Sequence, residues 1–586
     1  YIEEYDLIEL MNIPVVLSAS QEAECTHSAA SIISTLSGEE LLNMGARDLI
    51  DALELIPGFN FGSIVFNTVG LGVRGVQADE GKLSVLIDGI ILTEQRFGTT
   101  AFGSHFPVEH IDRIEVIRGP GSILHGNFAE LGVINIITKK GRELDGGVIG
   151  ASYGRFARGE ASKNTHLSMG KAWDDLELSF YGKYNDSHRS DRIYYDAQGD
   201  SFDMSESNKL ESLLGTFTAK YKGLSLQFLV DEYEEDSRDF FADSMSDANV
   251  EWRNRFATYA TKLGYQHVFN EGFKLDAGFD FSRQTPWQRS LLYIDGSLPD
   301  ELHEKVTVDH YKFDIKSTFS AEAGHYFVLG NSFQFENYEH DKSGFSGELP
   351  IFGNYTLYGE GVYKTDWTNI LVGLRFDWYS EYGTNFSPRV ALTKQIKQFH
   401  YKLLYSEAFH APTGGNFQLN EEYNQNHSAN QQILQIKPEK TRTYELELGY
   451  QFQRNLEVSV NFFYTHIDNF FIYTFDENLD DFYMNSDGLS NWGTETTLAY
   501  QHHNWGRIKA NYAFYQSIED AGNIFKALDS DGNVKYSGAN LSFPTHKLSV
   551  NHNLPITDSF SFNHTLIFSS ERHGYSGGTL VRHQPI

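Results

Sequence analysis

The residues with the types and spacing that could do chemistry are a glycine-rich cluster and scattered histidines and carboxylates. The run Arg118-Gly119-Pro120-Gly121-Ser122 could suggest a phosphate-cradling loop, but that loop needs Lys and Ser or Thr at fixed offsets, which are missing here. No Ser, His or Asp stands in a nucleophile-elbow or metalloprotease pattern. The sequence therefore predicts no enzyme, no catalytic residue, no metal site and no cofactor. Cys25, as the single cysteine, excludes an internal disulfide.

Two carboxylates have a spacing that places them on one face of a predicted strand. Glu445 and Glu447 alternate with Leu446, Leu448 and Tyr450. Successive side chains of a strand point to opposite faces, so the two carboxylates share the face away from the apolar residues. On a strand with an apolar outer face, these two carboxylates therefore point inward.

The elements around the glycine cluster indicate a small mixed domain. The apolar run 111–117 reads as a strand that stops at the glycine cluster, and the β-branched run 132–138 reads as a second, buried strand. Helical spacing from Ser37 to Pro57 predicts one helix, with Ser37 as its N-cap. A further strand is expected over 83–90.

Size and composition restrict the class of protein. A chain of 586 residues is too long for one ordinary core, so several domains or one large closed sheet is expected. Its net charge of −32 excludes nucleic acid as a partner, because phosphates would be repelled. Aromatic residues make up 14% of the chain, which suits a barrel with aromatic girdles. No run of 18 apolar residues appears, so no spanning helix is predicted.

From residue 147 onward the chain alternates apolar and polar residues in successive segments. The run 370–378, for example, sets Val372 and Leu374 against Arg375 and Asp377. A soluble sandwich also alternates, but 440 such residues with this aromatic content favour a membrane barrel. About nineteen segments can be counted. Short turns such as 221–223, 270–272 and 453–455 alternate with long connections near 187–207, 236–250, 286–304, 409–438 and 518–544.

Three motifs in the first part of the chain carry a family resemblance. The runs VLIDGI (85–90), IDRIEVIRGP (111–120) and GVINIIT (132–138) resemble the plug of TonB-dependent outer-membrane receptors. The resemblance implies an all-β membrane protein, a 22-stranded antiparallel barrel with an N-terminal mixed α/β plug in its lumen. The implied division is a periplasmic extension (1–20), a plug (21–146) and a barrel (147–586). We expect about three further strands, roughly 60–70 residues, beyond Ile586. Any secretory signal is expected either to have been removed already or not to be included in this sequence.

The N-terminal extension contains a segment that is similar to the family's TonB box. It comprises Ile13, Pro14, Val15, Val16, Leu17 and Ser18. An extended, β-prone segment can add as a strand to the sheet edge of a partner protein. The resemblance therefore implies that these residues bind TonB, which acts with its inner-membrane energising proteins. The alternative is that the segment is the first strand of the plug.

The resemblance also implies an electrostatic latch between plug and barrel. In the family, plug arginines pair with lumen-facing glutamates of the barrel. The matching positions here are Arg74, Arg118, Glu445 and Glu495. Breaking such a buried pair typically costs about 3–5 kcal/mol.

The ligand is less well defined by the sequence. Residues 405–412 resemble a family motif that ends in FRAP, with His410 in place of the arginine, and 436–439 resemble the LKPE that follows. His427 lies between these motifs, as a histidine does in haem receptors. The candidate ligand-binding residues are His410, His427, Tyr423 and Arg96.

The resulting prediction is a receptor of the Gram-negative outer membrane, in contact with lipid and lipopolysaccharide. It imports a scarce small molecule, for which a ferric siderophore is expected on family grounds. Haem, cobalamin or another nutrient is the first alternative, and a passive porin is the second.

Overall fold

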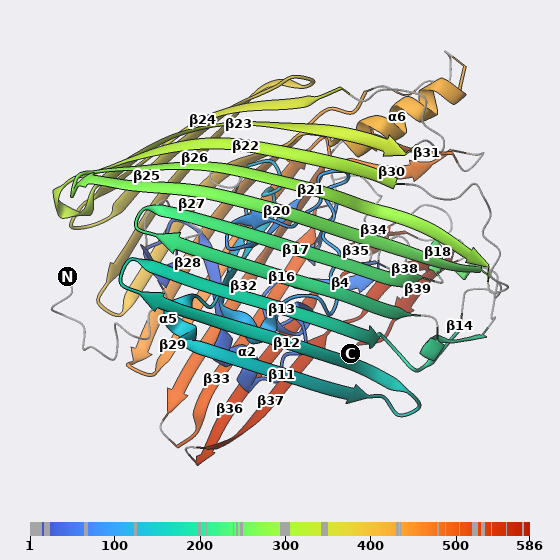
Figure 1. The fold of residues 1–586 in the computed structure, drawn as a ribbon, viewed down its shortest axis with the longest axis horizontal. Helices are drawn as coiled ribbons and strands as arrows, with labels where there is room; N and C mark the ends of the chain where they lie inside the picture. Colours follow the sequence, from blue (N-terminus) through green and yellow to red (C-terminus); the bar gives the residue numbers. More distant parts are fainter. Residues whose placement is uncertain are drawn as a thin grey trace.

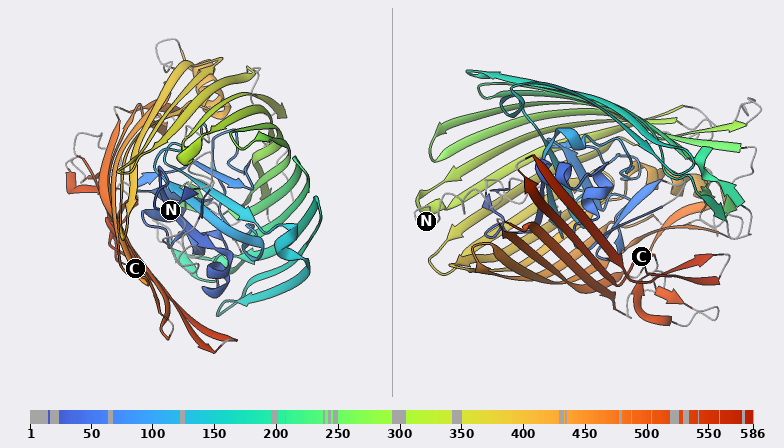
Figure 2. Two further views of the ribbon diagram at one scale, coloured as in Figure 1. Left: turned by 90° about the vertical axis from the view of Figure 1, so that its left-hand side faces the viewer. Right: turned by 90° about the horizontal axis from the view of Figure 1, so that it is seen from below.

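The fold consists of a small mixed domain enclosed by a large curved sheet (Figures 1 and 2). The computed structural model describes residues 15–16, 24–63, 68–121, 126–195, 201–206, 208–237, 239–241, 244–245, 250–293, 305–341, 350–428, 433, 435–476, 480–486, 488–502, 504–518, 526–528, 534–540, 542–557, 559–576 and 579–585. Within these residues no helix is long and apolar enough to cross a bilayer.

The inner domain, the plug, is built on a five-stranded sheet of order β3-β9-β10-β7-β8. Its strands are β3 (Ile32–Ser37), β9 (Ile111–Arg118), β10 (Gly132–Thr138), β7 (Leu83–Ile87) and β8 (Ile90–Ile91). The two apolar runs of the sequence pair antiparallel as β9 and β10, and β7 joins β10 in parallel. A second sheet contains β4 (Phe59–Ser63), β5 (Val69–Val73) and β6 (Val76–Gln77).

Two predictions for the plug are wrong in detail. The single helix expected over 37–57 is two short helices, α2 (Gly38–Asn43) and α3 (Leu49–Leu53). Gly45 ends α2 because it adopts a left-handed φ of 69°, and the side chain of Asp48 caps α3. Ser37 caps α2 as expected. The strand expected over 83–90 turns at Asp88-Gly89, where both φ angles are positive.

The outer sheet contains 19 antiparallel strands among the described residues, in agreement with the number counted from alternation. Each strand pairs with the next of the series, and β11 and β37 form the two edges. The strands are β11 (Gly146–Arg155), β12 (Glu160–Trp173), β13 (Leu176–His188), β16 (Lys209–Tyr221), β17 (Leu224–Ser237), β20 (Val250–Asn270), β21 (Phe273–Tyr293), β22 (Lys305–Ser320), β23 (Tyr326–Asp341), β24 (Phe352–Lys364), β25 (Asn369–Tyr379), β26 (Gly383–Ile396), β27 (Phe399–His410), β28 (Glu439–Gln453), β29 (Leu456–Asp468), β32 (Leu489–His502), β33 (Gly506–Ser517), β36 (His546–Thr557) and β37 (Phe560–Ser569).

The two faces of this sheet differ as the alternation predicts. On β25, Val372 and Leu374 are 55% and 50% exposed on the outer face, whereas Arg375 and Asp377 are buried on the inner face. The inner face surrounds the plug (Figure 2). Apolar side chains therefore cover the outside, and polar side chains face the plug.

The long connections carry small elements of their own. They include the hairpins β14 (Ile193–Tyr195) with β15 (Ser201–Asp203), β18 (Asp239–Phe241) with β19 (Ser244–Met245), β30 (Phe471–Phe475) with β31 (Asp481–Asn485), and β34 (Lys526–Leu528) with β35 (Val534–Asn540). A further hairpin, β38 (Arg572–Ser576) with β39 (Thr579–His583), follows β37. β14, β18, β30 and β31 lie at one end of the sheet (Figure 1).

Two of the observed connections differ from those predicted. The connection over 286–304 is shorter than predicted, because β21 continues to Tyr293 and pairs with β20. The connection over 409–438 contains a helix, α6 (Gly414–Asn426), which was not predicted. Thr413 caps α6. The apolar residues of this helix lack helical periodicity, so the sequence pattern did not predict the helix.

Candidate functional site

The four candidate latch residues lie together in the buried contact between plug and sheet. Arg74 follows β5 and Arg118 ends β9, whereas Glu445 and Glu495 point inward from β28 and β32. Arg74 donates from Nε and Nη2 to the two carboxylate oxygens of Glu495, each at 3.0 Å, and from Nη2 to Glu445 at 2.9 Å. Arg118 Nη1 donates to Glu495 Oε2 at 2.5 Å. Glu495 therefore bridges both arginines.

The backbone of the plug is shaped to allow this close approach. Arg74 has a left-handed φ of 53°, and its amide donates to the carbonyl of Gly58 at 2.8 Å. A Cβ at Gly58 would lie 2.7 Å from Glu495 Oε1, and one at Gly119 would lie 3.1 Å from Glu445 Oε2. Both glycines also have positive φ. Glycine is required at these turns because the carboxylates occupy the space of a side chain.

The cluster is electrically balanced, with two cations and two carboxylates. Burial opposes the charge of Arg74, but Glu495 and Glu445 outweigh it and raise the pKa of this arginine. The guanidinium also stacks on Phe463, 4.2 Å from the ring centroid, and Asn461 lies 3.4 Å from both glutamates. Such a cluster holds the plug firmly while intact, and removing one charge strands another. Its role as a latch stays a prediction.

A second charged cluster joins plug and sheet about His410. His410 Nδ1 lies 3.2 Å from Glu439 and 3.9 Å from Glu130, and Lys82 Nζ lies 3.4 Å from Glu439. All four side chains are buried. Gly81 packs against the imidazole, because a Cβ there would lie 2.5 Å from Nε2. The sequence analysis did not identify Lys82 and Glu130 as members of this cluster. Only Glu439 had a signal in the sequence, because it belongs to the motif at 436–439.

Two of the ligand candidates lie at the end of α6. His427 Nε2 lies 3.3 Å from Asp476 and 3.5 Å from Asp480, and its ring stacks on Tyr423 with centroids 3.9 Å apart. Tyr423 donates to Asp476 at 3.2 Å. Their partners are thus carboxylates of the neighbouring connection.

Arg96 lies apart from these residues, in the plug. It is buried, with Phe97 beneath its guanidinium and Gln418 of α6 at 3.4 Å. The structure therefore does not bring His410, His427 and Arg96 to a common site.

A cavity of about 540 Å³ lies between the plug and the inner face of β20 to β25. Plug residues Gln95, Asn127 and Phe128 form one wall. The opposite wall carries aromatic rings and charges of both signs, among them Lys312, Asp314, Tyr358, Arg375, Tyr379 and Tyr382. None of His410, His427, Tyr423 and Arg96 lines it. The hydroxyl of Tyr382 is buried and has no hydrogen-bond partner among the described residues.

The TonB-box-like segment is described only in part. Val15 and Val16 pair antiparallel with Cys25 and Glu24 in a separate two-stranded sheet, β1 (Val15–Val16) and β2 (Glu24–Cys25). Ile13, Pro14, Leu17 and Ser18 lie outside the described residues. The two valines are thus not part of the main plug sheet, and TonB binding stays a prediction.

A mixed domain enclosed by an antiparallel sheet, with an apolar outer face and buried ion pairs inside, defines the class of plugged β-barrels. The chain belongs to the TonB-dependent receptor family. Residues 144–581 match the TonB-dependent receptor-like β-barrel, and residues 26–133 match the TonB-dependent receptor plug domain. This is a family of transport receptors.

Several known proteins are similar to this chain. The vitamin B12 transporter BtuB of Vibrio vulnificus is 22% identical over 499 residues, which cover 69% of this chain and 79% of that protein. The siderophore receptor PirA of Acinetobacter baumannii superposes with a TM-score of 0.69 at 18% identity, covering 96% of this chain and 91% of PirA. A variant of the ferric enterobactin receptor PfeA of Pseudomonas aeruginosa gives a TM-score of 0.71 at 16% identity, covering 96% and 90%. These structural similarities establish the fold.

Proposed function

We propose that this protein imports a ferric siderophore across the Gram-negative outer membrane, with energy delivered through TonB. The observation that carries the proposal is the cavity between the plug and β20 to β25, which is large enough for a small chelate. Family membership supports the coupling to TonB and the small-molecule ligand. The apolar outer face of the sheet supports residence in the outer membrane, in contact with lipid and lipopolysaccharide.

The chemistry of the cavity wall suits an iron chelate. Tyr358, Tyr379 and Tyr382 offer flat apolar surfaces with hydroxyl groups, and Arg375 and Lys312 offer cationic donors. Ferric chelates carry aromatic or amide groups and often negative charge, so stacking and charge-assisted hydrogen bonds recognise them together. The iron is cargo, and the chelator supplies its ligands.

Cobalamin is the second candidate, because the match to the vitamin B12 transporter of V. vulnificus covers 69% of this chain. Haem is less well supported by the geometry. His410 is fully buried between carboxylates, and His427 is paired with Asp476 and Asp480, so the two imidazoles do not face one cavity. A passive porin is disfavoured because the plug occupies the space within the sheet.

The proposal is tested by ligand titration of the purified protein with ferric siderophores, cobalamin and haem, followed by growth assays under iron limitation. Tyr382→Phe removes only the hydroxyl that lacks a partner among the described residues. We expect the affinity for the siderophore to fall about three- to tenfold, as for one lost hydrogen bond.

Tyr363→Phe is the matched control, because Tyr363 is 58% exposed on the outer face. Tighter binding of cobalamin or haem than of ferric siderophores would overturn the assignment of a siderophore as the ligand. A steady large conductance of the intact protein in planar bilayers would indicate a porin.

A further inference from the structure

The first segment of the plug, residues 26–31, is fastened directly to the inner face of the barrel. Lys402 Nζ donates to the carbonyls of Thr26 at 2.7 Å and Ser31 at 2.9 Å. Thr393 donates to the carbonyl of Ser28 at 2.9 Å, and Arg389 contacts Ala30 and Ser31. This segment follows the TonB-box-like residues in the chain. It therefore lies between the expected TonB contact and the body of the plug.

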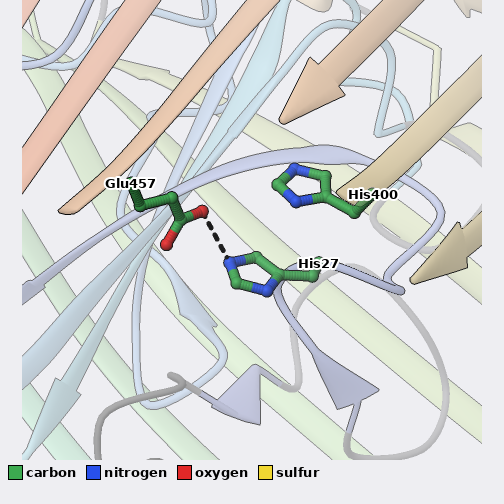
Figure 3. Close-up of side chains that lie close together, drawn as sticks. All are labelled: His27, His400 and Glu457. Carbon is green, nitrogen blue, oxygen red and sulfur yellow. Dashed lines mark ion pairs between the residues drawn. The ribbon is translucent and has the colours of Figure 1, made fainter. Parts of the chain in front are cut away.

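Two histidines and a glutamate meet within this contact (Figure 3). His27 Nε2 lies 2.9 Å from Glu457 Oε1, and the imidazoles of His27 and His400 stack with centroids 4.5 Å apart. One ligand atom from each of the three residues lies within 4.8 Å of the others. His400 and Glu457 are the second residues of β27 and β29, beside short turns of the barrel. His27 Nδ1 is buried and has no hydrogen-bond partner among the described residues.

Two imidazoles and a carboxylate form a ligand set that suits a borderline divalent ion such as Zn²⁺. The side chains of His27 and Glu457 are 18% and 31% exposed, so an ion can reach them from solvent and a fourth position can hold water. Behind His400, Glu447 Oε1 lies 3.5 Å from Nε2, and Lys402 Nζ holds Glu447 at 3.0 Å. A carboxylate behind a histidine orients the ring and raises its basicity.

Two other histidine and carboxylate groups among the described residues are less suited to a metal. Glu130, His410 and Glu439 are fully buried, and Lys82 already neutralises part of their charge. His427, Asp476 and Asp480 contain a single imidazole. Of the three groups, only that of His27, His400 and Glu457 combines two imidazole ligands with side chains that solvent can reach.

We propose that His27, His400 and Glu457 form a binding site for a divalent transition-metal ion of the Zn²⁺ type, which ties the first segment of the plug to the barrel. The ion adds a cross-link between residues far apart in the chain. It stabilises the docked segment and opposes its removal from the barrel wall. The site is independent of the ligand that the receptor imports.

The test is calorimetric titration of the full-length protein in detergent with ZnCl₂. All variants carry His427→Ala as a background substitution, so that the group of His427, Asp476 and Asp480 cannot contribute a second metal site. We expect one tight site in this background, weakened by more than about 100-fold in His27→Ala and in His400→Ala. His466→Ala is the matched control, because His466 also pairs with a carboxylate, Asp468 at 2.9 Å, on the same strand β29. The control should bind Zn²⁺ as the background does.

Electron paramagnetic resonance with Cu²⁺ gives a second readout. The background should show coupling to two imidazole nitrogens, and His27→Gln should show coupling to one. His27 lies on the plug segment and not on a barrel strand, so this variant keeps the barrel intact if His400→Ala does not fold. Zn²⁺ should also slow amide exchange over residues 26–31. Unchanged Zn²⁺ affinity in His27→Gln, or a Cu²⁺ spectrum unaffected by it, would overturn the proposal.

Discussion

Replacing Glu495 by glutamine should loosen the plug more than replacing Glu445. Glu495 accepts hydrogen bonds from Arg74 Nε, Arg74 Nη2 and Arg118 Nη1, whereas Glu445 accepts one from Arg74. The intact cluster has two positive and two negative charges. Glu495→Gln leaves two buried guanidinium groups with one carboxylate, so the cluster gains a net positive charge without access to water.

The difference in magnitude follows from the hydrogen bonds, because Glu445→Gln leaves the same net charge but breaks one charge-assisted hydrogen bond where Glu495→Gln breaks three. Removing one partner of a buried pair typically costs about 3–5 kcal/mol, and losing one charge-assisted hydrogen bond costs about 1.5–3 kcal/mol. We expect the first value for Glu495→Gln and the second for Glu445→Gln. Hydrogen exchange of the β9 and β10 amides measures the opening of the plug. It should accelerate between about a hundredfold and several thousandfold in Glu495→Gln, at about 1.4 kcal/mol for each factor of ten.

A four-residue cycle then tests whether the charges act as one unit. Glu445→Ala with Glu495→Ala strands both arginines, and adding Arg74→Ala and Arg118→Ala removes the stranded charges. The fourfold variant should recover part of the lost protection, because the effects of contacting residues are not additive. Barrel strands should keep slow exchange in every variant, which serves as the internal control. Additive effects of the glutamate pair and the arginine pair would refute the latch.

Two further predictions concern the extension and the pH dependence of the plug. Deleting 13–20 should leave ligand binding intact and abolish uptake, because strand addition to TonB is lost, and Val16→Pro should act similarly by removing a main-chain donor; normal uptake by either variant would exclude the assignment. Burial raises the pKa of Asp79 to about 6 from the ordinary 3.8, so the folded plug binds this proton more tightly than the unfolded chain does. The free energy of unfolding of the plug should therefore fall by on the order of 2 kcal/mol as the pH rises from about 4 to about 6. Urea titrations of Asp79→Asn should lack this pH dependence. The same pH dependence in Asp79→Asn as in the unsubstituted protein would contradict the prediction.

Local sequence patterns determined the class of the fold. The alternation that places Glu445 and Glu447 opposite Leu446 and Leu448 is a property of any extended strand, so it gave both the number of strands and their inner face. The N-cap at Ser37 was equally local, because its hydroxyl reaches an amide three residues away. Short motifs in β9 and β10 indicated the family. Each of these signals lies within a few residues, where pattern and structure are directly linked.

Where the patterns were weak or interrupted, the predictions failed. Gly45 splits a helix whose apolar spacing continues past it, because a left-handed residue ends the hydrogen-bond ladder. In α6 the cap at Thr413 and packing at the end of the barrel replace an apolar stripe, so periodicity carried no signal. His410 and His427 were grouped by their motif context, yet the fold sends one into the plug contact and the other to the end of α6.

Tertiary structure alone decided which charges meet. Arg74 and Glu495 are 421 residues apart, and their contact depends on the order of the barrel strands and on how the plug sits within them. The resemblance supplied the four latch residues, but only the structure shows that Glu495 bridges both arginines. His27, His400 and Glu457 share no sequence motif. They meet because the plug segment 26–31 contacts the barrel beside the first residues of β27 and β29. Side-chain spacing along the chain describes a strand, whereas contacts between plug and barrel depend on how the whole sheet curves around the plug.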